Sequence, residues 1–290
     1  MDLPIVVGVD GSEAGLRAVD WAADEAALRG LPLRLVYASL WERYEGSRPA
    51  EDLGRPSEQV RAEDIVAAAA RRASLRRADV KISTEVLPEE PEYTLVRESR
   101  GAALLVTGTR GRGGLAGALL GSVSLTLAGH AHCPMIVVRG DQDDRALPGR
   151  HGRVVVGVGD TPAAPATMRF AFEEARGRGA VLEAVRAWRC PAHETTDHPQ
   201  LAGGPARLHE QHAVDALEAA LKEAPDDVVV RRRTVEGHAR TVLVEASRDA
   251  DLLIIGARRR PRHFGLQLGR VAHGVLHHSD CPVAVVPEPV

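Results

Sequence analysis

The stretch Ile5-Val6-Val7-Gly8-Val9-Asp10 near the start of the chain returns 149 residues later as Val154-Val155-Val156-Gly157-Val158-Gly159. Two further segments return at a spacing of 148 residues: LLVTG at 104–108 as LLIIG at 252–256, and CPMIVV at 133–138 as CPVAVV at 281–286. Three separated segments thus keep one register across both halves. The sequence is therefore a tandem duplication.

Each half alternates short apolar runs with amphipathic stretches rich in Ala, Glu and Arg. Most of the expected strands are separated by a helix and read as apolar on both faces, so we expect buried parallel sheets covered by helices on both sides. Right-handed crossovers then give an α/β, Rossmann-like, doubly wound sheet of five strands in each half, with strand order 3-2-1-4-5. The predicted strands lie near 4–9, 32–38, 79–87, 103–107 and 134–138, with helices near 13–29, 57–77, 91–100 and 119–131, and the second half has strands near 153–158, 181–187, 227–235, 251–255 and 282–286.

The length of 290 residues is about twice the commonest domain size, in agreement with two domains. The stretch from Gly140 to Gly152 is polar, contains Gly and Pro and lacks periodicity, as linkers do. We therefore place the domains at 1–140 and 152–290.

Composition excludes several classes of protein. With 44% hydrophobic and 27% charged residues the chain is an ordinary globular one, and its net charge of -3 gives no basic field for nucleic acid or anionic lipid. Acidic Asp2 does not suit a secretory signal, and no apolar run approaches the roughly 18 residues of a membrane span. We expect Cys133, Cys190 and Cys281 to be buried thiols in a reducing compartment. The expectation is a cytoplasmic protein without nucleic-acid or membrane partners.

A ligand site is predicted where the strand order reverses, between the first and fourth strands. Open α/β sheets bind ligands at the carboxyl ends of such a pair. The first strand ends in Asp10-Gly11-Ser12, and the fourth enters a glycine-rich loop that leads to Gly121-Ser122-Val123-Ser124 at a helix start. Accessible backbone N–H groups and the positive end of the helix dipole predict an anion site there, for phosphate.

Purely structural roles for the same residues stay open. Glycine-rich loops are often only turns, and Asp10 could cap the helix that begins near Glu13, as could Ser12. The stretch 111–116 fits G-x-G-x-x-A, but it follows the fourth strand and lacks an acidic residue about 20 positions on, so it does not indicate a dinucleotide site. A P-loop would need Gly-Lys-Ser/Thr, which is absent.

The spacing Gly108-x-x-Gly111-(nine residues)-Gly121-Ser122, together with the opening strand, resembles the ATP-binding class of universal stress proteins over nearly the whole chain. The resemblance implies that Asp10 hydrogen-bonds the adenine or ribose end of ATP, with Gly8 and Val9 as the pocket floor. It implies that Ala38 lines the adenine and that Thr107 contacts the base through its backbone. The phosphates, which can carry Mg²⁺, would be surrounded by Gly108, Gly111, Gly121, Ser122, Val123 and Ser124.

The second half departs from this pattern. Asp10 becomes Gly159, Gly111 becomes Arg259 and Ser122 becomes Arg270, although Gly256 and Gly269 remain. A side chain is expected to remove the phosphate geometry if glycine serves positive φ or close approach. Two alternatives remain for the arginines, an electrostatic anion pocket or a solvated loop, and Asp160 could replace Asp10. The arginines concerned are Arg258, Arg259, Arg260, Arg262 and Arg270.

The resemblance implies a stress-response regulatory protein that binds ATP in its first half and acts on an unknown protein partner through conformation. A slow ATPase or phosphotransferase and a nucleotide-independent dimeric scaffold are the alternatives. The resemblance also implies that the last strands pair the halves as an internal pseudo-dimer, and a homodimer of whole chains is left open. No catalytic residue stands out. His209 and His212 lack the H-E-x-x-H spacing of a zinc site, and the pair His273/His277 has no third metal ligand nearby in the sequence.

Overall fold

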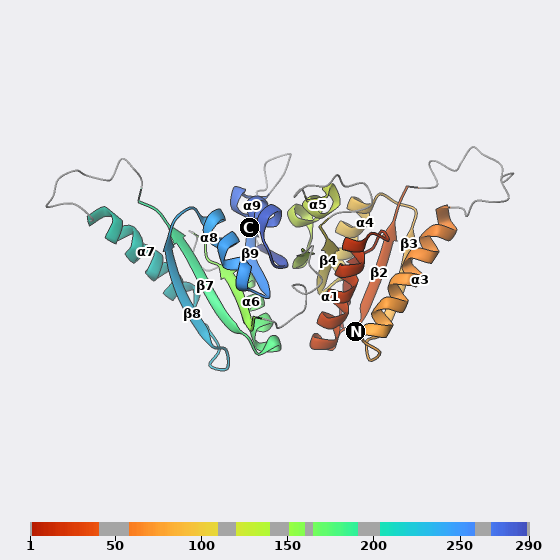
Figure 1. The fold of residues 1–290 in the computed structure, drawn as a ribbon, viewed down its shortest axis with the longest axis horizontal. Coiled ribbons are helices and arrows are strands. Elements are labelled where there is room, and N and C mark those ends of the chain that lie inside the picture. Colours follow the sequence, from red (N-terminus) through yellow and green to blue (C-terminus); the bar gives the residue numbers. More distant parts are fainter. Residues whose placement is uncertain are drawn as a thin grey trace. The chain divides into compact units, whose positions relative to one another are not determined.

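A computed structural model of the protein describes residues 2–40, 58–109, 120–139, 151–159, 165–190, 204–258 and 268–288. The chain divides into two compact units, Met1–Asp141 and Gln142–Val290, which we call unit 1 and unit 2. Each unit is α/β, with one parallel sheet between helices (Figure 1). The packing of the halves as a pseudo-dimer stays a prediction.

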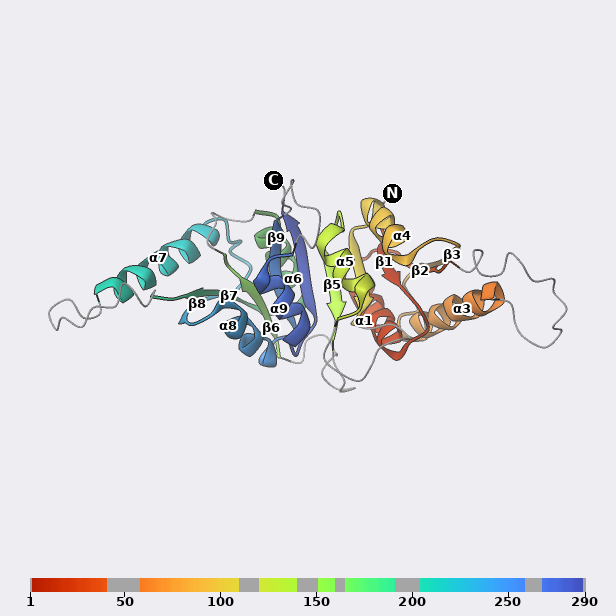
Figure 2. The ribbon, with the colours of Figure 1, turned by 90° about the horizontal axis from the view of Figure 1, so that it is seen from above.

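Unit 1 has the expected strand order, β3-β2-β1-β4-β5, with every pair parallel. Helices α1 and α3 cover one face of this sheet, and α4 and α5 cover the other (Figure 2). The strands are β1 (Ile5–Gly8), β2 (Leu33–Ala38), β3 (Ile82–Leu87), β4 (Leu104–Gly108) and β5 (Met135–Val138), and the helices are α1 (Glu13–Arg29), α3 (Glu58–Arg76), α4 (Pro91–Glu98), the 3₁₀ turn η1 (Ser99–Gly101) and α5 (Ser122–His130).

Unit 2 repeats the order as β8-β7-β6-β9-β10, again all parallel. The duplication and the doubly wound topology predicted from the sequence are confirmed. The strands are β6 (Arg153–Gly157), β7 (Val181–Trp188), β8 (Val230–Glu236), β9 (Leu252–Arg258) and β10 (Val283–Glu288), and the helices are α6 (Pro165–Arg178), α7 (Gly204–Ala220), α8 (Ala239–Ala246), the 3₁₀ turn η3 (Ser247–Asp249) and α9 (Arg270–His278).

The core is formed by the central strands, whose Ile, Leu and Val side chains are buried throughout β1 and β4. The outer strands β3 and β8 differ from the expectation that all strands are buried on both faces, which is wrong for these two. Most of their side chains are exposed or half-buried, because a strand at the end of a sheet has a neighbour on one side only. In β8 the exposed positions include Arg231, Arg232 and Arg233.

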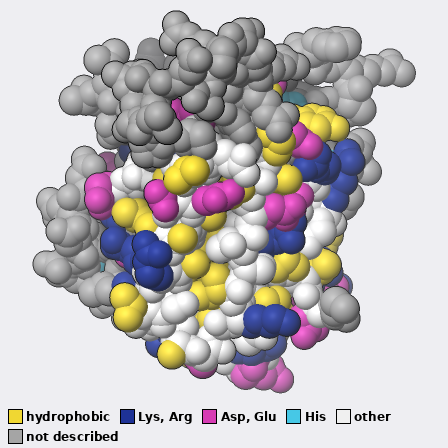
Figure 3. Space-filling model, turned by 90° about the vertical axis from the view of Figure 1, so that its right-hand side faces the viewer, with side chains coloured by type: hydrophobic (Ala, Val, Ile, Leu, Met, Phe, Trp, Pro, Cys, Tyr) yellow, Lys and Arg dark blue, Asp and Glu magenta, His cyan; other side chains and the backbone are white. Residues whose placement is uncertain are grey.

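The surface at the β3 side of unit 1 mixes both signs of charge. Figure 3 shows acidic, basic and apolar side chains interspersed over the described part of this face. Several ion pairs join α1 to α3 and to Arg77 after it. Arg72 donates to both carboxylate oxygens of Asp20, at 2.7 and 2.6 Å, and Asp24 accepts hydrogen bonds from Arg76 and Arg77. The hydrogen bond that Arg72 donates to Asp20 raises the pKa of Arg72. These pairs fasten α3 and the residue that follows it to α1.

The cysteines follow the prediction in two cases out of three. Cys133 and Cys281 are buried, and burial raises the pKa of each thiol to about 12. Cys190 is only half-buried, so the expectation of a buried thiol is wrong there. It lies just after β7, where the chain leaves the sheet.

Within the described ranges, none of the helices combines the length and the apolar character needed to cross a membrane.

Candidate functional site

The carboxyl ends of β1 and β4 lie side by side in unit 1. The two strands pair directly, with Val7 opposite Val106, while β2 lies on the other side of β1. The chain therefore reverses its direction of winding between β1 and β4, which is where open α/β sheets hold ligands. Asp10 follows β1 at this edge, Ala38 ends β2, and Thr107 and Gly108 end β4.

Asp10 is fixed by a short turn that joins β1 to α1. Its Oδ1 accepts hydrogen bonds from the backbone N–H of Ser12, at 3.0 Å, and from the Ser12 hydroxyl, at 2.6 Å. The Ser12 oxygen in turn accepts from the backbone N–H of Gly15, at 3.1 Å, and is the N-cap of α1. The capping role that the sequence left open between Asp10 and Ser12 thus belongs to Ser12. Asp10 orients the cap and stays half-buried at the sheet edge.

Two glycines make this turn feasible. Gly11 has a φ of 77°, in the left-handed region that favours glycine. A Cβ on Gly15 would lie 2.8 Å from Asp10 Oδ1 and 3.3 Å from the Ser12 oxygen. Sequence reasoning missed Gly15, whose only signal is a glycine in the first turn of a predicted helix. Its role is to let the carboxylate approach the helix.

Gly108 serves close packing at the end of β4. A Cβ there would lie 2.5 Å from the carbonyl oxygen of Ala14 and 2.6 Å from its carbonyl carbon. None of Gly108, Gly121, Gly256 and Gly269 has a positive φ. Gly111, the glycine for which a positive φ or close approach was expected, lies outside the described residues. At Gly108 the approaching group is the first turn of α1, so this glycine is required by the fold itself.

A buried chain of hydroxyl groups ties α5 to β4. Thr107 donates to the Ser124 oxygen at 3.2 Å, and Ser124 donates to the Gly108 carbonyl at 2.8 Å. Both side chains are buried. The Ser124 hydroxyl proton is therefore used inside the protein. The same bonds fix where α5 begins relative to β4.

The N-terminus of α5 lies at the same sheet edge and has no side-chain cap. Gly121 is the N-cap residue, with φ -66° and ψ 153°; its N–H donates to Thr109 at 2.8 Å, and the carbonyl accepts from Leu125 at 3.0 Å. Ser122 is exposed and Val123 is half-buried. The N–H groups of a first helical turn have no acceptor within the helix and carry the positive end of its dipole, so this end can bind an anion. Gly111 lies outside the described residues.

The remaining predicted residues lie at or just after the ends of β1 and β2. Val9 is buried and its N–H donates to Val36 at 2.9 Å, which extends the β1–β2 pairing beyond Gly8. A Cβ on Gly8 would lie 2.8 Å from Leu95 Cδ1. Ala38 is half-buried at the end of β2. The structure thus brings the described members of the predicted set to one edge of one sheet.

Unit 2 has the same frame with other side chains. Gly159 takes the place of Asp10, and a Cβ on Gly159 or Gly269 would meet nothing within 4 Å. A Cβ on Gly256 would lie 2.7 Å from the Thr167 hydroxyl. Among the residues that the structure describes, no three His, Cys, Asp or Glu side chains gather as metal ligands. The predicted contributors Asp160, Arg259, Arg260 and Arg262 lie outside those residues.

Comparison with known proteins assigns both units. The model of the family described as "Universal stress protein family" matches residues 3–139 and, a second time, residues 151–287. The chain belongs to the universal stress protein family. This universal stress protein is 34% identical to universal stress protein Rv1996 of Mycobacterium tuberculosis over 304 residues, which cover 98% of this chain and 95% of the relative.

Two further likenesses span the full length of this universal stress protein. Universal stress protein Rv2623 of the same bacterium is 32% identical over 303 residues, covering 99% of this chain and 97% of the relative. The crystal structure of a universal stress protein from Archaeoglobus fulgidus matches with a TM-score of 0.68 at 16% identity, covering 99% of this chain and 98% of that one. The first likeness covers both units of the chain, and the second shows the fold.

Proposed function

We propose that this universal stress protein is a stress-response regulator that binds ATP in unit 1 and acts through nucleotide-dependent conformation or partner binding. The observation that carries the proposal is the pairing of two chemically opposite ends at one sheet edge. A carboxylate, Asp10, ends β1, and an uncapped helix N-terminus, that of α5, follows β4. An adenine nucleotide has hydroxyl and amine donors at one end and phosphates at the other.

The charges decide which end of ATP lies where. The Asp10 carboxylate would repel phosphate, but it can accept a hydrogen bond from a ribose hydroxyl or the adenine amine. The buried Val9 side chain, with Gly8 and Ala38 beside it, supplies an apolar wall for the base. Because the Thr107 hydroxyl is engaged with Ser124, this residue would contact the base through its backbone.

The phosphates would lie at the first turn of α5. There the backbone N–H groups of Ser122, Val123 and Ser124 and the exposed Ser122 hydroxyl are the donors, with Gly121 leaving the approach open. Gly108 and Gly111 complete the proposed set. Residues 120–139 contain no carboxylate, so Mg²⁺ would be held by the phosphate oxygens of the nucleotide that brings it.

Unit 2 is proposed not to bind ATP. Gly159 has no side chain that could accept from the ribose or the adenine, and Arg270 is the first residue of α9, whereas α5 begins with Ser122. Both ends of the nucleotide would lose a contact. The expected stoichiometry is therefore one ATP per chain.

Native mass spectrometry of the full chain purified without added nucleotide tests the proposal, together with calorimetric titration of ATP. The expected result is one adenine nucleotide per chain and a Kd in the micromolar range, about -8 kcal/mol. Two equivalents per chain would contradict the assignment of the site to unit 1 alone. Absence of both bound nucleotide and titration heat would contradict nucleotide binding.

A further inference from the structure

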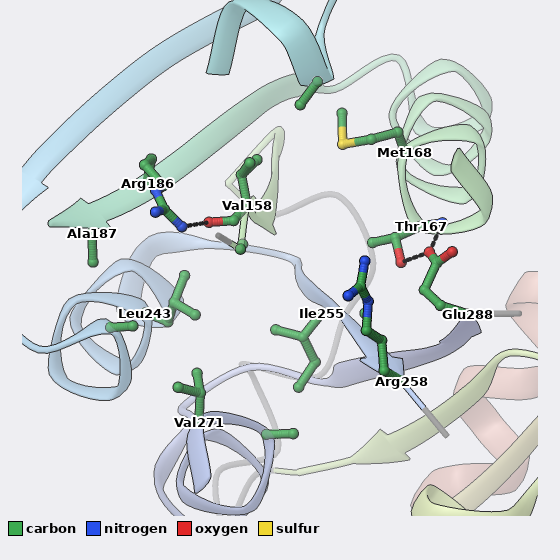
Figure 4. A pocket seen from close by; sticks show the side chains of 16 residues that line it. Val158, Thr167, Met168, Arg186, Ala187, Leu243, Ile255, Arg258, Val271 and Glu288 are labelled. Carbon is green, nitrogen blue, oxygen red and sulfur yellow. Dashed lines mark hydrogen bonds between the residues drawn. The ribbon is translucent and has the colours of Figure 1, made fainter. Parts of the chain in front are cut away.

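Unit 2 contains a pocket of about 280 Å³ at the position that corresponds to the proposed ATP site of unit 1 (Figure 4). The backbone at the end of β6, at Val158 and Gly159, forms part of its wall. The end of β9 and the first turn of α9 form further parts, through Gly256 and Ala272. A cavity is thus present at this sheet edge, although unit 2 has neither the acidic residue nor the serine of the unit 1 pattern.

One part of this cavity is apolar. Leu243 from α8, Ile255 from β9 and Val271 from α9 lie near one another along it (Figure 4). Leu243 and Ile255 are buried, whereas Val271 is 37% exposed. An apolar body in the pocket would cover Val271 without displacing the core. The surface therefore suits a ligand with a hydrocarbon part.

The charged side chains that line the pocket are Arg186, Arg258 and Glu288. The Nη1 atom of Arg186 donates to the Val158 carbonyl at 3.1 Å, which directs its charge along the wall. Arg258 is exposed at the end of β9, and Figure 4 shows its guanidinium group reaching into the pocket. Two arginines and one glutamate give these three residues a net charge of +1.

Glu288 is committed to another contact. Its Oε1 accepts from the backbone N–H of Thr167 at 2.7 Å and from the Thr167 hydroxyl, so the carboxylate caps the N-terminal turn of α6. The side chain is only 5% exposed. Glu288 therefore helps to fix the wall, and Arg258 is the charged group that a ligand can reach.

The first turn of α9 adds to the positive potential. Gly269 is the N-cap residue and makes no side-chain cap, and Val271 and Ala272 of that turn line the pocket. The turn and Arg258 thus favour a negative ligand group at the same cavity. The combination of cavity, arginine and apolar wall carries the inference, and the helix end alone would not.

The charge of the lining residues favours a ligand with a single negative charge. Pockets for drug-sized ligands measure about 300–1,000 Å³, so this cavity of about 280 Å³ lies at the small end of that range. A phosphate monoester carries about -1.5 to -2 charges at neutral pH, and a triphosphate carries more. A carboxylate carries one charge, which matches the +1 of the lining residues, and a guanidinium group binds its two oxygens side by side.

We propose that unit 2 binds a small organic monocarboxylate with an apolar body. Arg258 and the first turn of α9 hold the carboxylate, and Leu243, Ile255 and Val271 contact the hydrocarbon part. This goes beyond the proposed ATP function, because it assigns unit 2 a ligand of a different chemical class. The two halves then report on two different molecules.

The binding test uses calorimetry on the full chain saturated with ATP. Benzoate and hexanoate are the probes, with the uncharged benzamide and hexanamide as matched controls. We expect one carboxylate per chain, undisturbed by ATP, and at least about tenfold weaker binding of each amide, as for loss of a charge-assisted hydrogen bond. If neither carboxylate binds at millimolar concentration, if the amides bind equally well, or if ATP competes, the proposal is wrong.

Substitutions at two positions test the charge assignment. Val271→Asp introduces a carboxylate in the first turn of α9, where it favours the helix but repels an anion, and Val271→Asn is the uncharged variant of the same shape. We expect Val271→Asp to lower benzoate affinity at least about tenfold below that of Val271→Asn. Arg258→Gln should lower the affinity for benzoate by a similar factor. Arg232 is exposed on β8 and does not line the pocket, so Arg232→Gln should leave that affinity unchanged. Equal effects within either pair would overturn the proposal.

Discussion

The Ser12 hydroxyl group donates to Asp10 Oδ1 at 2.6 Å and accepts from the Gly15 N–H at 3.1 Å. One serine thereby links the group proposed to meet the ribose or adenine to the first turn of α1. The carboxylate cannot turn away from Ser12 without breaking the contacts that hold the cap. The position of a ligand group and the start of a helix are consequently set by the same hydrogen bonds.

Removing the cap should therefore affect both stability and binding. Ser12→Ala leaves the Gly15 N–H without its acceptor, and loss of such a cap costs about 1 kcal/mol of unfolding free energy. The substitution should also lower the affinity for ATP, because Asp10 loses a donor that orients it. Urea denaturation and calorimetric titration measure the two effects. If Ser12→Ala binds ATP as tightly as the original chain, Asp10 does not depend on this contact.

The glycine at the end of β4 gives a second prediction. Gly108→Ala places a Cβ against the Ala14 carbonyl group, which can yield only if α1 shifts, and overpacking of this kind costs about 1–3 kcal/mol. Gly101→Ala is the matched control, since a Cβ there meets nothing within 4 Å. Urea denaturation of both variants checks the difference. Equal stability of the two variants would contradict the close approach of β4 to α1.

The buried thiols give a pH dependence with a defined sign. Burial raises the pKa of Cys133 and Cys281 from an ordinary 9.0 to about 12, so the folded chain keeps both thiols protonated where the unfolded chain ionises them. Their contribution to stability is complete below pH 9 and is lost as the pH rises from 9 towards 12, by about 1.4 kcal/mol per pH unit for each thiol.

Denaturation curves of the original chain and of the double variant Cys133→Ala/Cys281→Ala, recorded from pH 7 to 10.5, check this prediction. The relevant quantity is the slope against pH, because the lost sulfur atoms also change packing at every pH. The double variant should lose less stability between pH 9 and 10.5. Parallel curves would mean that neither thiol is protected from ionisation.

The sequence was sufficient to predict the features that depend on periodicity. Apolar runs at a fixed repeat predicted the strands, and alternation with helices predicted the parallel order in both units. It was insufficient for the burial of β3 and β8. The runs near 79–87 and 227–235 were correctly predicted as strands, but these strands lie at the ends of their sheets and are not buried on both faces. Position in the sheet, which decides burial, is a property of the whole topology.

For the site, the sequence predicted the sheet edge but not how several residues act. The spacing motif predicts that Gly108 contacts phosphate. It does not predict that Gly108 packs against Ala14, because this contact joins two segments almost a hundred residues apart. The same holds for Ser124, whose hydroxyl binds the Gly108 carbonyl. Such contacts leave no local pattern. A spacing motif therefore predicts which segments meet at a sheet edge, whereas the contacts of its individual residues follow from the tertiary structure.

The two helix starts offer a matched pair of substitutions. Gly121 and Gly269 are the N-cap residues of α5 and α9, with nearly equal backbone angles, φ -66° and -64°. We expect Gly121→Arg to abolish ATP binding, because its side chain fills the approach to the first turn of α5. Gly269→Arg, where a Cβ has open space, should leave ATP affinity unchanged. Calorimetry on both full-length variants, with circular dichroism to check folding, makes the comparison.

Other results of this comparison would contradict the assignment of the ATP site to unit 1. Loss of ATP binding in Gly269→Arg alone would assign the site to unit 2, and loss in both variants would indicate two sites. Unchanged affinity in Gly121→Arg would show that the first turn of α5 does not hold the phosphates. Each result separates the proposed ATP site from the carboxylate pocket, whose tests use other residues.

The last prediction concerns hydrolysis. Fast phosphoryl transfer needs an oriented nucleophile and stabilisation of charge at the γ-phosphate. The segment 108–124 contains no carboxylate that could orient a water molecule, and Asp10 is assigned to the opposite end of the nucleotide. We therefore expect turnover well below about 1 s⁻¹, the low end of ordinary enzyme rates. A nucleotide that stays intact for so long can act as a signal.

Asp10→Ala distinguishes a binding protein from an enzyme. The substitution removes an acceptor at the ribose or adenine end, so it should weaken ATP affinity by about tenfold or more, as for loss of a hydrogen bond to a charged group. Hydrolysis per bound nucleotide should stay nearly the same, because no reacting atom loses a contact. Steady-state turnover and titration of the same preparation measure the two quantities. Turnover above that limit, abolished in Asp10→Ala with binding retained, would assign Asp10 to the chemical step and make this universal stress protein an ATPase.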